Sequence, residues 1–446
     1  MEQLNDAAGL AEVSAADVDP SIIVPATLTR KKLGRGFWVF FAVAFFFDLG
    51  FAVYFFLFNL YLLDLHFNER SLGLVGGALT LGSVVGTLPA GWLGRKLGLR
   101  PLLAFCLVSA PILGIARALV FAEWEHIGLA FMAGLAMCLW GVCFLPMVAA
   151  LTDEENRATA FGLIFSVSIG SSAVGELVCS YLPHWLAVAG FALQAAETKR
   201  GILIAACCVA MAGLIPWFLL RDPSQKSDPP GASGAGKRTR EVNGFLVRFL
   251  PAMALWSAVA GAFASFSNVY LSKSLHIPLP QIGLVFSAAQ VLQLCVGLMT
   301  PLFFRWLSLE RGVLVAQVSS AIALGLLAGT KDRGLAIGLF LSFSATQWMS
   351  SPGVYNVLMS RVLPQERGWA SAATLFCNAV VQSGLTACAG ILIVRFDYSR
   401  TLAGACGLAA MAALLFAIFV VPARTWVGKG NRRQAAKVFN SGESTL

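Results

Sequence analysis

Long apolar runs dominate this chain and restrict what it can fold into. Each is about 20 residues long, the length of α-helix that crosses the roughly 30 Å hydrocarbon core of a bilayer. Hydrophobic residues make up 58% of the 446 positions and charged residues only 12%, against roughly 25% charged in soluble proteins. The runs predict spans at 37–63, 71–94, 100–122, 127–151, 158–182, 201–220, 248–272, 281–304, 312–330, 334–360, 368–394 and 401–421. We therefore expect an all-α integral membrane protein with twelve transmembrane helices.

One polar segment divides these runs into six and six. It extends from Arg221 to Asn243 and contains a Pro-, Gly- and Ser-rich stretch followed by basic residues, a composition typical of flexible linkers. We therefore expect two six-helix bundles joined by a linker. The predicted boundaries are a tail at 1–35, the first bundle at 36–220, the linker at 221–247, the second bundle at 248–422 and a tail at 423–446.

The two halves carry the same pattern of polar residues. Arg157 and Arg367 lie 210 positions apart (367 − 157), and each precedes an apolar run. The polar positions that follow have matching spacing: Ser168, Ser172 and Glu176 in the first half, and Asn378, Gln382 and Thr386 in the second. A second match pairs Asn59 and His66 with Asn268 and His276. Internal duplication around a central site is common in secondary transporters.

Basic residues indicate the orientation of the chain. They concentrate at 30–35, 95–100, 221–248 and 424–437, all on one side of the predicted spans. Because the cytoplasmic side of a membrane protein carries the excess of Lys and Arg, both termini and the linker are expected in the cytoplasm, with the protein in the cell membrane. The same charges form no basic domain, so the net charge of +9 does not indicate a nucleic-acid partner.

A short glycine-rich segment between the second and third predicted spans resembles a known signature. It reads Gly91-Trp-Leu-Gly-Arg95-Lys96-Leu-Gly98-Leu-Arg100 and is similar to the G-x-L-x-D-R-x-G-R-R loop of the major facilitator superfamily. The resemblance implies two pseudo-symmetric six-helix bundles and a monomer. It also implies a cytoplasmic gating region, here Gly91, Arg95, Lys96, Gly98, Arg100, Arg157 and Arg367. Arg95 stands where the family has an aspartate that supports a charged latch, so that latch is expected to be altered or absent.

Asp48 is the strongest candidate for ion coupling. It lies 13 residues after Arg35 in an apolar run, about 20 Å along a helix that rises 1.5 Å per residue. A carboxylate at such depth costs about 2.5–3.5 kcal/mol on insertion scales, and a carboxyl group there can take up and release a proton as the protein changes state. In the superfamily this span lines the central cavity. The alternative is a structural carboxyl group bonded to a neighbouring helix.

Glu176 and Arg117 are two further charged residues within apolar runs. Glu176 lies about 28 Å beyond Arg157 by the same helical rise, near the outer surface. It is expected to bind a proton or cation or to form part of an outer gate; the alternative is a carboxylate wetted by the headgroup region. Arg117 is expected to be structural, with its long side chain reaching the outer surface and pairing with Glu123 or Glu125.

Uncharged polar and aromatic side chains in the predicted spans form the candidate substrate site. Polar groups are stable in a membrane only when other helices or a bound molecule partner them, so each joins helices or binds substrate. The candidates are Asn59, Ser168, Ser172, Ser257, Asn268, Gln290, Gln293, Gln347, Asn378 and Gln382, with Trp140 and Trp348 as aromatic walls. Because fixed positive charges are scarce on these spans, a small neutral or cationic organic solute is favoured.

The sequence contains no motif of a hydrolase, an oxidoreductase or an ATP-driven pump. We therefore expect neither an enzyme nor a cofactor. The four histidines, at positions 66, 126, 184 and 276, fall in predicted outer loops, so no metal site is expected.

The leading hypothesis is a secondary active transporter that moves a small organic solute by alternating access and couples this movement to protons through Asp48. Glu176 is the second candidate for coupling, and the partners are the solute, protons and the lipid bilayer. Alternatives of the same fold are an uncoupled facilitator and a lipid or drug efflux protein. A different class is a non-transporting membrane sensor or scaffold, for which the sequence offers no sizeable soluble domain.

Overall fold

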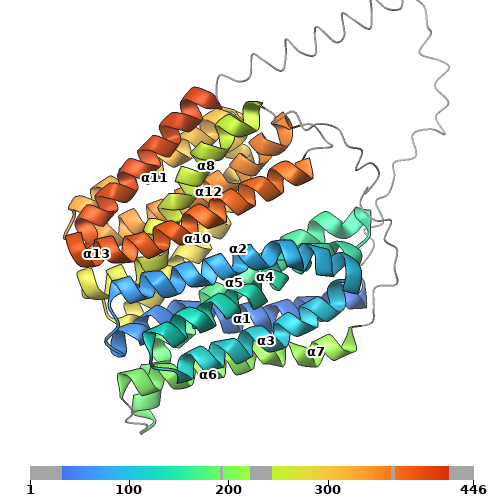
Figure 1. Ribbon diagram of the computed structural model, residues 1–446, viewed down its shortest axis with the longest axis vertical. Coiled ribbons are helices and arrows are strands. Elements are labelled where there is room, and N and C mark those ends of the chain that lie inside the picture. Colours follow the sequence, from blue (N-terminus) through green and yellow to red (C-terminus); the bar gives the residue numbers. More distant parts are fainter. Residues whose placement is uncertain (1–32, 191–193, 221–243, 363–366, 421–446) are drawn as a thin grey trace, which may run out of the picture.

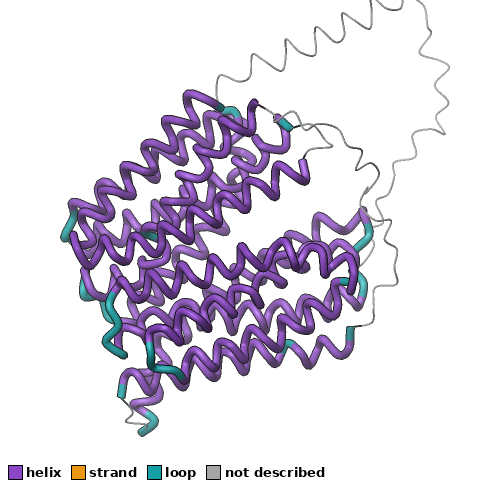
Figure 2. The backbone as a smooth tube through the Cα atoms, viewed as in Figure 1, coloured by secondary structure: helices purple, strands orange, loops and turns teal. Residues whose placement is uncertain are grey.

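The computed structural model describes residues 33–190, 194–220, 244–362 and 367–420. Helices form nearly all of this described part, and no strand occurs in it (Figure 2). The all-α fold class is therefore confirmed. The predicted tails and linker lie almost wholly outside the described residues.

The helices of the first half follow the predicted spans. They are α1 (Arg35–Asp64), α2 (Glu69–Leu97), α3 (Leu99–Leu119), α4 (Glu123–Ala150), α5 (Glu154–Val188), α6 (Ala195–Ala212) and the short α7 (Leu214–Leu219). Several extend past the predicted apolar limits because polar caps, not the end of the apolar run, set where a helix begins. The side chain of Asn68, for example, accepts the N–H of Ser71 and caps α2.

The second half repeats this order with one interruption. Its elements are α8 (Gly244–Ala262), η2 (Ala264–Phe266), α9 (Ser267–Val269), η3 (Tyr270–Ser274), α10 (Leu279–Leu307), α11 (Leu309–Gly329), α12 (Arg333–Arg361) and α13 (Arg367–Phe419). The 53-residue α13 contains two helices, because Asp397 has non-helical backbone angles in its middle. Within the described residues nine helices are long and apolar enough to cross a membrane. The count of twelve spans stays a prediction, with α2, α12 and the second part of α13 as the additional candidates.

The duplication is visible in the backbone as well as in the sequence. Six described residues have a positive φ, and they form three pairs at equivalent turns: His66 with His276, Gly98 with Ser308, and Gly190 with Asp397. The first two pairs are separated by the 210 positions of the sequence repeat. Since positive φ is uncommon outside glycine, its recurrence at matching turns indicates that the two halves share one chain path.

Side chains of α1 fasten it to α3. The hydroxyl of Tyr54 donates to the carbonyl of Gly114 at 3.1 Å, and that of Tyr61 donates to the carbonyl of Ala118 at 2.9 Å. Arg117 lies between these bonds and is only 3% exposed; its guanidinium stands 4.1 Å from the centre of the Phe58 ring.

Two predictions about the first half are wrong: the pairing of Arg117 with a glutamate and the placement of all four histidines in loops. Among the described residues Arg117 stacks on aromatic rings and does not pair with Glu123 or Glu125, since Glu125 accepts the N–H of Ala122 instead. A stacked guanidinium is shielded by the ring faces, so the side chain stays inside the bundle. His126 and His184 lie within α4 and α5, so the prediction that all four histidines are in outer loops is wrong for these two.

The two halves meet at one end of the molecule and diverge toward the other (Figure 1). At the first end, which we call the closed end, α2 packs on α13 and α5 packs on α10. Glycines permit the α2–α13 contact: a Cβ on Gly73 would lie 3.0 Å from the Cα of Gly390 and 2.7 Å from the carbonyl oxygen of Thr386. The other end, where α2, α4 and α10 finish and α5 and α13 begin, is called the open end.

The seventh predicted span is broken near the closed end. α8 stops at Ala262, and Phe263 departs from helical geometry with φ −127°. The 3₁₀ turn η2, the three residues of α9 and the π-helical turn η3 then carry the chain to Ser274. Ser257 and Asn268, two of the candidates for the substrate site, therefore lie on separate elements, α8 and α9.

Candidate functional site

Asp48 bonds to a neighbouring helix of its own half. It lies in the middle of α1, and its carboxylate accepts a hydrogen bond from the hydroxyl group of Ser168 on α5. Ser168 begins the polar stripe of α5, and the hydroxyl of Ser172, one turn later, donates to the backbone carbonyl of Ser168 at 3.0 Å. The structure thus brings together Asp48 and Ser168, which the sequence placed on different spans.

Glu176 lies between the two halves at the closed end. It is 6% exposed, and its Oε1 accepts the side-chain amide of Gln290 on α10 at 3.3 Å. Its second oxygen, Oε2, has no hydrogen-bond partner among the described residues. One turn away, Ser287 of α10 donates to the carbonyl of Ala173 at 2.5 Å. Glu176 is therefore part of a packed α5–α10 contact, and the alternative of a carboxylate wetted by headgroups is wrong.

Asn59 and Asn268 also cross between the halves. The side-chain amide of Asn59 donates to the carbonyl of Ser265 at 2.9 Å, and that of Asn268 donates to the carbonyl of Phe56 at 2.8 Å. The Phe56 ring packs against Phe286 of α10, with centroids 5.3 Å apart. In this conformation both amide groups have backbone partners; their role as substrate ligands stays a prediction.

An ionic contact that the sequence analysis missed lies beside them. Lys273 of η3 donates to Glu69 of α2 at 2.7 Å, and the hydroxyl of Tyr398 reaches the same carboxylate oxygen at 3.4 Å. Glu69 is buried. The contact joins three elements from both halves: α2, η3 and α13. The only signal in the sequence was one acidic and one basic residue flanking predicted outer loops, which does not identify a pair.

Of the remaining polar candidates in the second half, one joins two helices, and the others have an oxygen without a partner among the described residues or are half-buried. Gln293 of α10 donates to the hydroxyl of Ser344 on α12 at 2.7 Å. The Oδ1 of Asn378 on α13 is buried without a partner among the described residues. Three further candidates are half-buried: Ser257 on α8, Gln347 on α12 and Gln382 on α13.

The two candidate tryptophans differ in their surroundings. Trp140 of α4 packs in an aromatic cluster, with ring centroids 4.2 Å from Phe47 and 5.0 Å from Phe144. Trp348 of α12 is 42% exposed. Trp348 is therefore the more accessible of the two, while Trp140 contributes mainly to packing within the first half.

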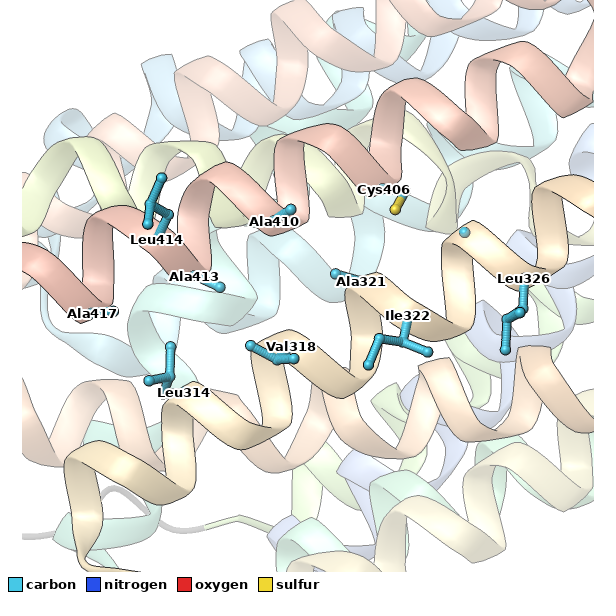
Figure 3. Close-up of a pocket in the computed structure, with 11 residues that line it drawn as sticks. Leu314, Val318, Ala321, Ile322, Leu326, Cys406, Ala410, Ala413, Leu414 and Ala417 are labelled. Carbon is cyan, nitrogen blue, oxygen red and sulfur yellow. The ribbon is translucent and has the colours of Figure 1, made fainter.

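A separate apolar groove of about 620 Å³ lies on the flank of the second half. It runs between α11 and the end of α13 and is lined by side chains such as Leu314, Ile322 and Leu414 (Figure 3). Ile322 and Leu414 are exposed and Leu314 is half-buried, on helices that are long and apolar enough to cross a membrane. The groove belongs to one half alone and carries no polar candidate, so it is distinct from the polar groups between the halves.

Comparison with known proteins identifies the architecture. A model of the Major Facilitator Superfamily matches residues 40–384, which include parts of both halves and all of the repeated polar positions except Thr386. This chain belongs to the major facilitator superfamily. It is therefore a multi-pass membrane transporter and not an enzyme, and the predicted superfamily fold is confirmed.

Individual members of the superfamily resemble the chain over most of its length. Sugar efflux transporter B of Salmonella typhimurium is 24% identical over 318 residues, which cover 69% of this chain and 76% of that protein. The crystal structure of the nucleoside transporter NupG has a TM-score of 0.68 and 15% identity, covering 86% of this chain and 99% of that one. The inward open conformation of the xylose transporter XylE from E. coli has a TM-score of 0.69 and 14% identity, covering 86% and 96%. The structural likenesses show the shared fold.

The superfamily signature segment is mostly helical here. α2 continues through Gly91, Arg95 and Lys96 to Leu97, so only Gly98, with φ +88°, separates it from α3. The predicted spans left residues 95–99 between them, but a single residue with positive φ is enough to reverse the chain. The ammonium of Lys96 stands 5.1 Å from the centre of the Trp92 ring.

The arginines of the predicted gating region are only partly described. The side chains of Arg95 and Arg367 lie outside the described residues. The Nε of Arg157 is buried without a hydrogen-bond partner among the described residues, and Arg100 follows Gly98 at the start of α3. A gating role for these residues stays a prediction.

Proposed function

We propose that this transporter is a proton-coupled carrier of a small, neutral, hydroxyl-bearing solute, with Asp48 as the group that takes up the proton. The Asp48–Ser168 contact carries the proposal. Among the described residues the partner of this carboxyl group is a hydroxyl, and no cation neutralises it. Within the membrane a charged carboxylate costs about 2.5–3.5 kcal/mol on insertion scales, and uptake of a proton removes that cost.

Coupling follows if the two protonation forms of Asp48 favour different conformations. A ligand shifts a conformational equilibrium only by its difference in affinity between the states, and a proton is a ligand in this sense. Asp48 joins α1 to α5, and both helices reach the contacts at the closed end through Asn59 and Glu176. Protonation at Asp48 therefore acts on two helices that take part in closing that end.

The closed end is assigned to the outer side of the membrane. The basic segment 95–100 and Arg157 lie at the open end, and an excess of basic residues favours the cytoplasm. The conformation is then inward-facing, with both termini and the linker in the cytoplasm. Opening of the closed end gives the outward-facing state of the cycle.

The choice of a neutral hydroxyl-bearing solute rests on side-chain chemistry and on the relatives. The Asn and Gln candidates supply both donors and acceptors, which match hydroxyl groups, and the exposed face of Trp348 suits the apolar side of a ring. The relatives named above include transporters of sugars, a nucleoside and xylose. Monosaccharides, disaccharides and nucleosides are therefore the first solutes to test.

Proton movement in proteoliposomes tests the proposal. Purified full-length protein is reconstituted with a pH-sensitive dye inside and exposed to pools of the three solute classes. Asp48→Asn is compared with wild type and with Asp332→Asn, a matched control. Asp332 caps α12 by accepting the N–H of Leu335 at 2.7 Å, and an asparagine caps a helix about as well.

The expected result is that one pool evokes proton flux in wild type and in Asp332→Asn but not in Asp48→Asn, which still binds and exchanges the solute. Solute uptake without proton movement would replace the proposal with an uncoupled facilitator. Proton flux that survives Asp48→Asn would remove Asp48 from the coupling, and Glu176→Gln would then be tested in the same assay.

A further inference from the structure

Two asparagines at equivalent positions of the repeat bind the opposite half in the same way. Each donates its side-chain amide to a backbone carbonyl that lies three residues before the other asparagine. Asn59 bonds to Ser265 at 2.9 Å, and Asn268 bonds to Phe56 at 2.8 Å. The two bonds therefore form a reciprocal pair related by the pseudo-twofold symmetry of the fold.

The interruption of α8 prepares the acceptor for one of these bonds. In an unbroken α-helix the carbonyl of Ser265 accepts the N–H of Val269. Here that N–H donates to the side-chain oxygen of Asn268 at 2.9 Å, and the carbonyl of Ser265 accepts Asn59. Asn268 thus uses both ends of its amide, one within its own half and one across to α1.

The position of the pair gives it influence over the closed end. Asn268 is 5% exposed and Phe56 is 4% exposed, so the bond between them is shielded from water, while the Asn59–Ser265 bond is partly buried. The Glu69–Lys273 contact and the Glu176–Gln290 contact lie on other elements of the same end. Separation of α1 from the α8–η3 segment has to break both asparagine bonds together.

We propose that Asn59 and Asn268 form a symmetric clasp that holds the closed end shut and sets how often it opens. The proposal rests on alternating access between the two halves. It requires neither a particular solute nor proton coupling, so the clasp can hold even if the proposed role of Asp48 fails.

The expected size of the effect follows from ordinary hydrogen-bond energetics. One protein hydrogen bond shifts an equilibrium by about two- to tenfold. Asn59→Leu removes one donor at similar volume, so it is expected to raise the open fraction of the closed end by that factor. Asn268→Leu removes the donor to Phe56 and also the acceptor of the Val269 N–H, so its effect is expected to be at least as large. The double variant is expected to show the product of the two factors, because both bonds break in the same movement.

Hydrogen–deuterium exchange of the full-length protein measures the opening. Peptides covering 54–60 and 263–270 report on the clasp itself. Peptides covering 73–77 and 383–390 report on the α2–α13 contact, which neither asparagine touches. Ser320→Ala is the control, because Ser320 bonds to Thr346 at 2.7 Å within the second half only. Asn59→Ala, which removes the donor and adds no bulk, serves if the leucine variant does not fold.

The clasp predicts faster exchange at both pairs of peptides in the asparagine variants and wild-type exchange there in Ser320→Ala. Faster exchange confined to 54–60 and 263–270 would overturn the proposal, because the bonds would then stabilise only their own surroundings. Unchanged exchange at all four peptides in Asn59→Leu and Asn59→Ala would overturn it as well.

Discussion

Glycines at the contacts of α2 with its neighbours allow strain to be placed either between the halves or within one half. Gly390→Ala would push a Cβ onto the carbonyl of Glu69 and to 3.0 Å from the Cα of Gly73, at the α2–α13 contact. Gly82→Ala would push a Cβ onto the carbonyl of Phe131, where α2 packs on α4. Both changes crowd a side chain against backbone, but only the first contact lies between parts expected to separate.

The consequence differs because the strain is relieved differently. Overpacking of this kind costs about 1–3 kcal/mol. At the α2–α13 contact the protein can relieve it by opening the closed end, so Gly390→Ala is expected to shift the closed-to-open ratio by about 5- to 150-fold. Opening does not relieve the strain from Gly82→Ala, which is expected to lower the melting temperature by about 2–12 °C.

Two measurements on the purified variants separate these outcomes. Amide exchange at 73–77 and 383–390 follows the closed end, and thermal unfolding follows overall stability. Gly390→Ala should exchange faster there and melt within a few degrees of wild type, whereas Gly82→Ala should show the opposite pattern. If Gly390→Ala melts as low as Gly82→Ala while exchange at the closed end stays at the wild-type rate, the two halves do not separate at this contact.

Two further predictions concern a turn and an ion pair. Ser308 has φ +64° where its counterpart is Gly98, so Ser308→Gly is expected to stabilise the protein by about 1 kcal/mol and Gly98→Ser to destabilise it by a similar amount; thermal unfolding of both variants checks this, and shifts of equal sign would contradict it. Lys273→Met leaves the buried carboxylate of Glu69 without its cation, and is expected to weaken the closed end by about 1–3 kcal/mol. Amide exchange at 69–77 measures this loosening. Lys273→Arg keeps the positive charge and should exchange at close to the wild-type rate.

Local features of this fold were predictable because they depend on short stretches of sequence. The apolar runs located the helices, and the repeated Asn–His spacing located the turns that the structure forms at His66 and His276. Helix ends were less predictable: His126 and His184 fell just outside the apolar runs, yet α4 and α5 include them. A helix can continue into polar residues beyond the hydrocarbon region, so an apolar run marks its minimum length.

Contacts between helices could not be derived from one sequence. Asp48 and Ser168 were both identified as polar positions, but their hydrogen bond depends on how α1 and α5 are rotated about their axes. The Glu69–Lys273 pair depends on the placement of one half against the other. The break at Phe263 has no local signal either, since Gly261 and its neighbours are also found in continuous membrane helices.

The clearest departure from symmetry lies in the first helix of each half. α1 is a continuous helix of 30 residues, while its repeat counterpart stops at Ala262 and continues through turns of different pitch. A continuous helix behaves as a stiff rod, and a segment of changing pitch behaves as an elbow. When the closed end opens, bending should concentrate in the second half while α1 moves as one piece. The two copies of the duplicated helix would then differ mechanically: α1 moves as a rigid body, and its counterpart contains the hinge.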